Sequence, residues 1–176
     1  MEKLILGEKT MRKTIEDIIA EAAIRDVQMR YCRACDRMDF ELLRGCFHAD
    51  ATTEYGYFGG SVDEFIASAK VQIPGFLVTT HNTGNQNIVV NGDTALAEHY
   101  TVATHRLAAD EHGPLRDFIA SVRYVDRMEC REGDWRIARR VLIVDWTRTD
   151  PVADAPPDPD VPRAKRDRDD LSYTLP

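Results

Sequence analysis

Membrane-spanning runs are absent from this 176-residue chain, because no apolar stretch approaches the roughly 18 residues that a spanning helix needs. The apolar stretch near the N-terminus is too short for a secretory signal, so we expect a cytoplasmic protein with no membrane partner. An excess of positive charge is also absent, since 30 acidic residues outnumber 23 basic ones and leave a formal charge of −7. Phosphate backbones bind to basic surfaces, so this composition argues against a nucleic-acid partner.

The chain has four cysteines, and their positions in the sequence do not predict a metal or redox site. Cys32 and Cys35 form a C-x-x-C motif, but the pair lies inside a predicted helix rather than at a helix N-terminus, where a thiolate would be stabilised. No second C-x-x-C completes four zinc ligands, and His99 and His105 would stand about 20 Å apart on one strand. Glycine-rich strand-to-helix loops, which bind nucleotides, are absent too. We therefore expect reduced thiols, no metal and no cofactor.

Helical signals dominate the first 75 residues. Three segments can cap a helix N-terminus: Thr14-x-x-Asp17, Asp39 and Ser61-x-x-Glu64. The predicted helices cover 14–37, 40–47 and 62–71, and the third is closed by Pro74-Gly75. A short strand over 51–55 and a turn at Gly59-Gly60 separate the second helix from the third.

The following sequence has the character of β-strands. Long strands are predicted over 76–90, 94–107, 116–130 and 135–147. Asn91-Gly92 is a strong hairpin signal, Glu132-Gly133 predicts a second turn, and Gly84 predicts a bulge or kink. Helices followed by antiparallel strands indicate an α+β fold, in which a curved antiparallel sheet wraps around the N-terminal helices. We expect a cone-shaped α+β barrel with an internal pocket.

Composition divides the chain into three parts. Residues 1–10 are expected to form a loose arm, 11–149 a single α+β barrel domain, and 150–176 a tail rich in proline and aspartate. Six of the eight prolines lie at or beyond Pro151. We expect this tail to lie outside the core, where it is disordered or lies over a neighbouring subunit or the pocket mouth.

An acid and an imidazole are the main candidates for chemistry. Asp36 ends the first predicted helix, and His81 opens the β region 45 residues later. A carboxylate beside an imidazole fixes the ring tautomer and makes the ring a better proton acceptor. Five histidines and 30 acidic residues make accidental pairs common, but Asp36 shares the helical register of Cys32, which directs it inward.

The residues around this pair follow a family pattern. In chain order they are Ile24-Arg-Asp, Tyr31, Asp36, Asp39, Leu42, Phe47, Asp50-Ala51, His81-Asn82, Gly92-Asp93-Thr94-Ala95, Tyr124-x-Asp126-Arg127 and Gly133-x-Trp135-Arg-Ile137. This pattern resembles the SnoaL-like superfamily, whose cone-shaped fold is shared with scytalone dehydratase, ketosteroid isomerase and nuclear transport factor two. The resemblance covers about residues 12–148.

The resemblance is to a subgroup with hexachlorocyclohexane dehydrochlorinase and the bile-acid dehydratase. It implies a catalytic dyad at the positions of Asp36 and His81, and pocket tyrosines at those of Tyr31 and Tyr55. The bile-acid enzyme has an arginine where this chain has Val144, so its substrate binding is not carried over. The same fold also serves as a non-catalytic partner in ring-hydroxylating dioxygenases, so fold alone does not imply catalysis.

The sequence therefore predicts a cofactor-independent lyase that acts on a small, apolar, cyclic or aromatic substrate. His81 would be the general base, and Asp36 would orient the ring and stabilise the imidazolium. Tyr31, with Tyr55 or His99, would assist the departing hydroxide, halide or carbonyl oxygen. Elimination of water is the default reaction, and dehydrohalogenation or retro-aldol loss of formaldehyde remains open. The rate should fall as the pH drops, because the base must be neutral.

Further contacts are predicted from strand and loop positions. Substrate-binding residues are predicted to be Tyr55, His99, Phe118, Trp146 and Arg140. Arg139 and Arg140 point to opposite faces of one strand, so at most one of them reaches the pocket. His105 and His112 are predicted to be solvated near a loop, and His48 to have a structural role at a helix C-terminus.

Three alternatives remain open at this stage. An isomerase or cyclase of the same fold would use a carboxylate as the shuttling base. An epoxide hydrolase would need Arg123, Asp126 and Asp145 around one water, but strand parity does not bring them together. A non-catalytic small-molecule-binding or oxygenase partner subunit would need no dyad. We expect a homodimer or homotrimer formed through the open sheet face, and an isolated, stable homo-oligomer would weaken the partner-subunit alternative.

Overall fold

The computed structural model describes residues 13–56, 58–153 and 158–174, so the predicted arm over 1–10 lies outside the described residues. The first half contains α1 (Ile15–Arg37), α2 (Phe40–Gly45), β1 (Phe47–Glu54), β2 (Gly59–Ser61), α3 (Val62–Gln72) and the 3₁₀ turn η1 (Ile73–Gly75). The second half contains β3 (Val78–Asn91), β4 (Thr94–Leu107), β5 (Arg116–Arg131), β6 (Asp134–Pro151) and the short helix α4 (Leu171–Thr174).

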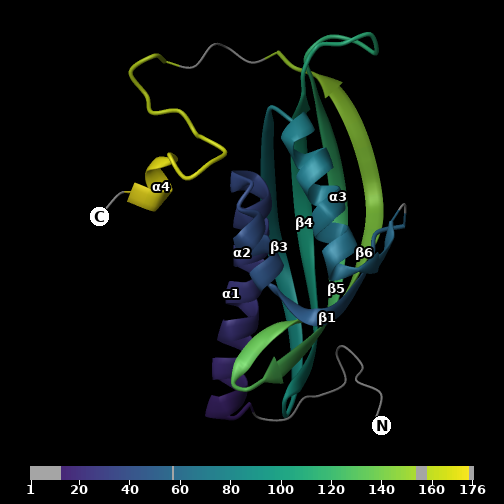
Figure 1. Ribbon diagram of the computed structural model, residues 1–176, viewed down its shortest axis with the longest axis vertical. Helices are drawn as coiled ribbons and strands as arrows, with labels where there is room; N and C mark the ends of the chain where they lie inside the picture. The colour runs from purple at the N-terminus through teal and green to yellow at the C-terminus, as the bar shows by residue number, and fades with distance from the viewer. Residues whose placement is uncertain (1–12, 57, 154–157, 175–176) are drawn as a thin grey trace.

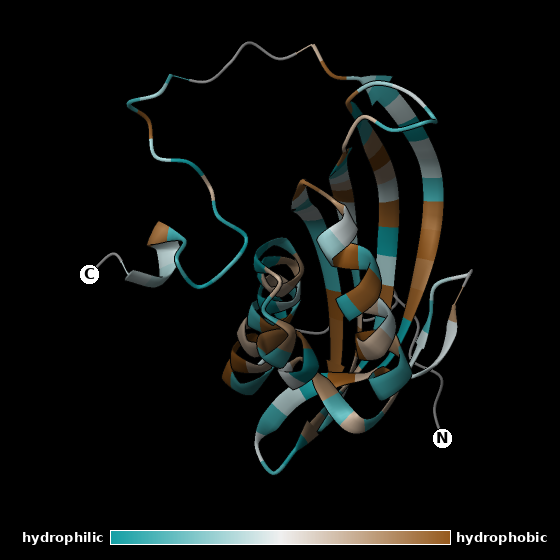
Figure 2. Cartoon of the chain, turned by 45° about the horizontal axis from the view of Figure 1, so that its top comes forward, coloured by the Kyte–Doolittle hydropathy of each residue, from teal (hydrophilic) through white to brown (hydrophobic). Residues whose placement is uncertain are grey.

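The strands form one curved, open sheet with the order β2-β1-β6-β5-β4-β3. Neighbouring strands are antiparallel except β1 and β6, which pair in parallel. Helices α1 and α3 lie against one face of this sheet (Figure 1). Hydrophobic and hydrophilic bands alternate along the long strands (Figure 2), because successive side chains point to opposite faces. The predicted α+β class, with a curved sheet around N-terminal helices, is confirmed.

Local signals place the helix starts and the long hairpins. The side chains of Thr14 and Ser61 cap α1 and α3 in capping boxes. Glu132 and Gly133 both have positive φ, as a type I′ turn between β5 and β6 requires. Between β3 and β4 the turn residues are Gly92 and Asp93, one position later than predicted, and Gly92 alone has positive φ. The predicted irregularity at Gly84 appears as a register shift between β3 and β4.

The last strand, β6, continues to Pro151, four residues beyond the predicted end at 147. Around β1, two predicted elements differ in kind from the structure. The second helix ends at Gly45 rather than 47, and Phe47 begins β1. The predicted turn at Gly59-Gly60 belongs to β2, which pairs with β1. Both differences arise because β1 gains its partners, β2 and β6, through pairings that local periodicity does not encode. His48 consequently lies on β1, where its Nε2 bonds the Glu129 carbonyl oxygen at 2.9 Å.

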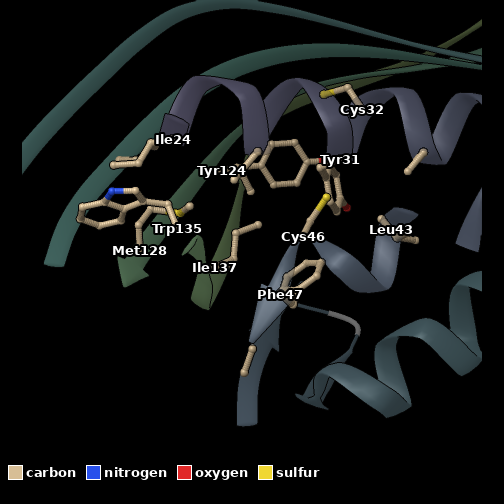
Figure 3. Close-up of a cluster of buried hydrophobic side chains, with 14 of the residues drawn as sticks. Ile24, Tyr31, Cys32, Leu43, Cys46, Phe47, Tyr124, Met128, Trp135 and Ile137 are labelled. Carbon is tan, nitrogen blue, oxygen red and sulfur yellow. The ribbon is translucent and has the colours of Figure 1, made fainter. Parts of the chain in front are cut away.

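The core fills the space between α1 and the inner sheet face (Figure 3). Ile24, Leu43, Phe47 and Ile137 are all fully enclosed there, and Trp135 is 8% exposed. The four cysteines are free, and three of them are buried. Within the described residues, no helix is both long and apolar enough to span a membrane.

One ion pair is buried in this core. Arg140 donates two hydrogen bonds of 2.7 Å to Asp126, and neither side chain is exposed. The Arg140 guanidinium lies 4.1 Å from the ring centre of Tyr31 and 4.4 Å from that of Tyr124. Burial alone would lower the pKa of Arg140, but Asp126 outweighs burial and raises it, so the ion pair persists.

Candidate active site

The last turn of α1 brings Asp36 against the start of β3. Asp36 Oδ1 lies 2.7 Å from His81 Nδ1, and Oδ2 accepts a hydrogen bond from the His81 backbone N–H at 3.0 Å. Thr79 Oγ1 also donates to Asp36 Oδ1, at 3.0 Å. A carboxylate only accepts hydrogen bonds, so the ring proton of His81 is on Nδ1 and Nε2 keeps its lone pair. The carboxylate therefore leaves the imidazole with one basic nitrogen.

The imidazole of His81 faces a cavity of about 520 Å³. The cavity lies between α3 and η1 on one side and strands β3 to β6 on the other, with α1 contributing Tyr31 and Cys35. Its remaining wall residues are mainly apolar or aromatic: Tyr55, Phe58, Phe65, Ala69, Ile73, Phe76, Ala103, Phe118, Ala120, Val122, Tyr124, Leu142 and Val144. Asp36 does not line the cavity, so it contacts a bound molecule only through His81.

Two tyrosines bring a pair of hydroxyl groups to the wall. The hydroxyls of Tyr31 and Tyr55 lie 2.8 Å apart, and both side chains line the cavity. Burial raises the pKa of each phenol above its ordinary value, so both remain protonated at neutral pH. Because both phenols keep their protons, either hydroxyl can act as a proton donor to a leaving group.

His105 is a cavity residue that the sequence prediction misplaced. It was predicted to be solvated, but it lines the cavity, with its ring centre 5.6 Å from that of His81. Burial lowers its pKa to about 4, helped by electrostatic interaction with the neighbouring His81 imidazole, so the ring is neutral at physiological pH. Its Nδ1 is buried without a hydrogen-bond partner among the described residues. The signal was available, because His105 shares strand parity with the inward-facing His99.

The other predicted contacts divide into two groups. Tyr55 and Phe118 line the cavity, whereas three residues predicted to bind substrate, Trp146, His99 and Arg140, do not. Trp146 is 46% exposed, because the register shift between β5 and β6 directs Thr147 rather than Trp146 into the cavity.

His99 and Arg140 lie in the core outside the cavity wall. Both are fully buried, His99 packs on Tyr124 with ring centres 5.0 Å apart, and Arg140 pairs with Asp126. Strand parity places only one of Arg139 and Arg140 on the inner face, and that residue is Arg140. Parity does not tell which inward side chains line the open part of the cone and which are packed in the core.

Other chemistries find little support in this arrangement. Arg123 contacts Asp145 and Glu98 near the surface, whereas Asp126 is buried with Arg140. The three residues that an epoxide hydrolase would need therefore do not surround one site. In the described part of the chain, no cluster of three or more histidine, cysteine, aspartate or glutamate residues could hold a metal ion.

The curved sheet over the N-terminal helices is the fold expected of a SnoaL-like protein. The chain belongs to this family, because residues 16–141 match the model of the SnoaL-like domain. A search of the curated proteins finds no match.

Solved structures resemble the whole domain. A protein of unknown function from Mycobacterium tuberculosis is 27% identical, with a TM-score of 0.65 and 78% of each chain covered. A provisionally assigned scytalone dehydratase from Novosphingobium aromaticivorans is 24% identical, with a TM-score of 0.67, covering 80% of this chain and 97% of that one. A hexachlorocyclohexane dehydrochlorinase, LinA-type3 from Novosphingobium barchaimii, is 16% identical, with a TM-score of 0.71, covering 81% and 99%. The latter two likenesses concern the fold alone.

Proposed function

We propose that this protein is a cofactor-independent lyase that catalyses an elimination on a small, largely apolar, cyclic or aromatic substrate. The observation that carries the proposal is the 2.7 Å contact between Asp36 and His81 Nδ1, with the imidazole on the wall of an apolar cavity. Two similar structures bear the names of a dehydrochlorinase and, provisionally, a dehydratase, and both names denote eliminations.

The reaction begins with proton transfer to His81 Nε2. The base removes a proton from substrate carbon, and the electrons of the broken C–H bond form a carbon–carbon double bond. The leaving group departs from the neighbouring carbon with its bonding electrons, as chloride or as hydroxide that takes a proton from the Tyr31–Tyr55 pair to become water. Asp36 stabilises the imidazolium that forms. After dehydration the imidazolium loses its proton and the tyrosine regains one, whereas after dehydrochlorination the imidazolium proton leaves to solvent as the counterpart of chloride.

Elimination is favoured over an isomerisation with a carboxylate base by the position of Asp36. An isomerase that shuttles a proton on a carboxylate needs that carboxylate against the substrate. Asp36 lies behind His81 and outside the cavity wall, with both oxygens engaged by His81 and Thr79. A role in orienting the imidazole fits this placement better.

The test uses two probes of elimination. Hexachlorocyclohexane reports dehydrochlorination through released chloride, and a cyclic β-hydroxyketone reports dehydration through the absorbance of the conjugated enone. For the probe that is turned over, we expect His81→Ala to lower kcat by about 10²- to 10⁴-fold. Asp36→Asn should also lower kcat strongly, because its amide can donate to Nδ1 and place the ring proton on Nε2.

The control is His112→Ala, since His112 is exposed on a loop and should leave kcat unchanged. Turnover that survives His81→Ala but not Asp36→Asn would instead indicate a carboxylate base, as in an isomerase. A rate that stays constant between about pH 5 and pH 8 would contradict a neutral imidazole base. Absence of turnover with both probes in the wild type would contradict an elimination on these substrate classes.

A further inference from the structure

The C-terminal segment returns to the fold after β6. Residues 158–174 pass beside the C-terminal end of α1, and α4 lies on the same side of the molecule (Figure 1). Arg168 and the Tyr173 hydroxyl both contact the Asp39 carboxylate, at 3.2 and 3.3 Å. Asp170 lies 3.5 Å from Arg37. The segment is therefore attached next to the turn that follows Asp36, through several polar contacts.

Arg166 makes the most extensive of these contacts. Its guanidinium donates hydrogen bonds to the backbone carbonyls of Asp36, at 3.4 Å, of Ile73, at 3.3 Å, and of Phe76. It also donates to the hydroxyl of Thr79, at 3.3 Å. Asp36 lies at the end of α1, and Ile73 is the first residue of η1. Phe76 follows η1, and Thr79 is the second residue of β3. One side chain thus connects three separate pieces of backbone.

The hydrogen bonds of Arg166 continue into the dyad. Thr79 Oγ1 accepts from Arg166 and donates its own proton to Asp36 Oδ1, at 3.0 Å. Asp36 Oδ1 also accepts a hydrogen bond from His81 Nδ1. The Asp36 carbonyl is one of the unsatisfied groups at a helix C-terminus, where a cation is favourable. Arg166 therefore contacts both the backbone and the hydroxyl partner of the acid.

Two further features fit a fixed role for Arg166. Ile73, Phe76 and Thr79 all line the cavity, so the guanidinium holds part of the cavity rim. Arg166 is half-buried, and this burial lowers the pKa of its guanidinium. A partly desolvated guanidinium depends on its acceptors, because they replace the water contacts that burial removes.

We propose that Arg166 is a positioning residue, which holds Thr79 and the end of α1 so that Asp36 stays against His81. The C-terminal segment is then part of the active unit, although its sequence is rich in proline and charge. The inference rests on the proposed lyase function for its catalytic readout, but the geometry of the dyad can be measured without turnover.

The experiment compares three variants of the full chain. Arg166→Ala removes every contact, and Arg166→Lys keeps the charge but cannot reach carbonyls and hydroxyl together. Arg163→Ala is the matched control, because Arg163 is an exposed arginine of the same segment. The first readout is kcat and KM with the elimination probe that the wild type turns over. The second is the downfield proton resonance of the His81 Nδ1–H, identified by its loss in His81→Ala.

For Arg166→Ala we expect kcat to fall on the order of 10-fold with little change in KM, because a displaced base loses alignment before binding is lost. Arg166→Lys should be intermediate, and Arg163→Ala should stay within about twofold of the wild type. The ring-proton resonance should broaden or shift in Arg166→Ala, while the variant stays fully folded at the assay temperature.

Unchanged kcat together with an unchanged ring-proton resonance in Arg166→Ala would overturn the inference. A lower kcat together with a lower thermal midpoint and an unchanged ring-proton resonance would also overturn it, because that result describes general destabilisation. If the wild type turns over neither probe, the proposed function fails on its own. The resonance of His81 then still decides whether Arg166 positions the dyad.

Discussion

His99 and His105 are two buried imidazoles whose protonation the fold opposes. The pKa of each is lowered to about 4, first because burial disfavours the imidazolium and then because of a neighbouring charge, Arg140 for His99 and His81 for His105. An unfolded histidine titrates near a pKa of about 6.5. Between these values the unfolded chain binds protons that the folded chain does not, so the free energy of unfolding falls as the pH drops from about 6.5 towards 4.

This linkage gives a prediction for His105→Gln, measured by urea unfolding at about pH 7 and at about pH 4.5. Between the higher and the lower pH, the free energy of unfolding should fall by about 1 to 3 kcal/mol more in the wild type than in the variant. The reason is that the unfolded variant has one histidine proton fewer to take up. His112→Gln serves as the control, since His112 is exposed and its removal should leave the pH dependence unchanged. Equal losses in wild type and His105→Gln would contradict the prediction.

At the same scale, the candidate site was partly visible in the sequence. Asp36 and His81 could be paired because a helix end and a strand start recur at these positions in the family the sequence resembles. His105 and Trp146 were misplaced for different reasons. Strand parity would have directed His105 inward, but its nearness to a loop suggested solvent. The position of Trp146 depends on a register shift in β6, which has no local sequence signal.

At the scale of elements, the β5–β6 hairpin contains a strained position. Glu132 has a φ of 55°, in the left-handed region that asparagine and glycine adopt more readily than glutamate. It is followed by Gly133, also with positive φ, so the turn has the type I′ geometry that favours Asn-Gly. Because the Glu132 side chain is exposed, replacing it should change little besides backbone strain.

We therefore expect Glu132→Asn to raise the free energy of unfolding by about 0.5 to 1 kcal/mol, measured by urea unfolding at neutral pH. Glu132→Val should lower it, because a β-branched residue tolerates positive φ poorly. Glu132 does not line the cavity, so kcat should not change in either variant. A less stable Glu132→Asn variant would contradict the proposed source of strain.

The elements themselves show which parts of a fold are encoded locally. The bounds of β4 were predicted correctly, and both hairpins were expected, because alternation and turn residues are properties of short segments. The helix-to-strand change at Phe47 was not expected. β1 is held by parallel pairing to β6, about 90 residues away, and by β2, so its limits follow from the assembled sheet.

At the scale of the whole molecule, the outer sheet face carries an apolar patch that the helices do not cover. We define this outer patch as Tyr100, Val102, Ile143 and Trp146. Val102 and Trp146 both flank Ser121 in one cross-strand row, and Tyr100 and Ile143 both flank Arg123 in the next. Tyr100, Val102 and Trp146 are 41–46% exposed. Exposed apolar side chains gathered on one uncovered sheet face, here on either side of Ser121 and Arg123, mark interaction surfaces.

We predict that the outer patch joins copies of this chain into a homodimer or homotrimer. Light scattering after size-exclusion chromatography should then give two or three times the chain mass of 20.0 kDa. Trp146→Asp should shift the protein to the monomer, because a carboxylate buried in an apolar interface is costly. The control Val161→Asp places the same charge on an exposed residue of the C-terminal segment and should leave the mass unchanged. A monomeric wild type at tens of micromolar would contradict the prediction.

The position of the outer patch also determines what dissociation should do to catalysis. The patch and the cavity lie on opposite faces of the sheet, and the dyad, the tyrosine pair and Arg166 all come from one chain. A monomeric Trp146→Asp variant should therefore keep its kcat, with a lower thermal midpoint as the main cost. Loss of kcat in a folded monomer would instead mean that a neighbouring copy supplies part of the active site. The dyad, the tyrosine pair and Arg166 of one chain would then not be sufficient for catalysis.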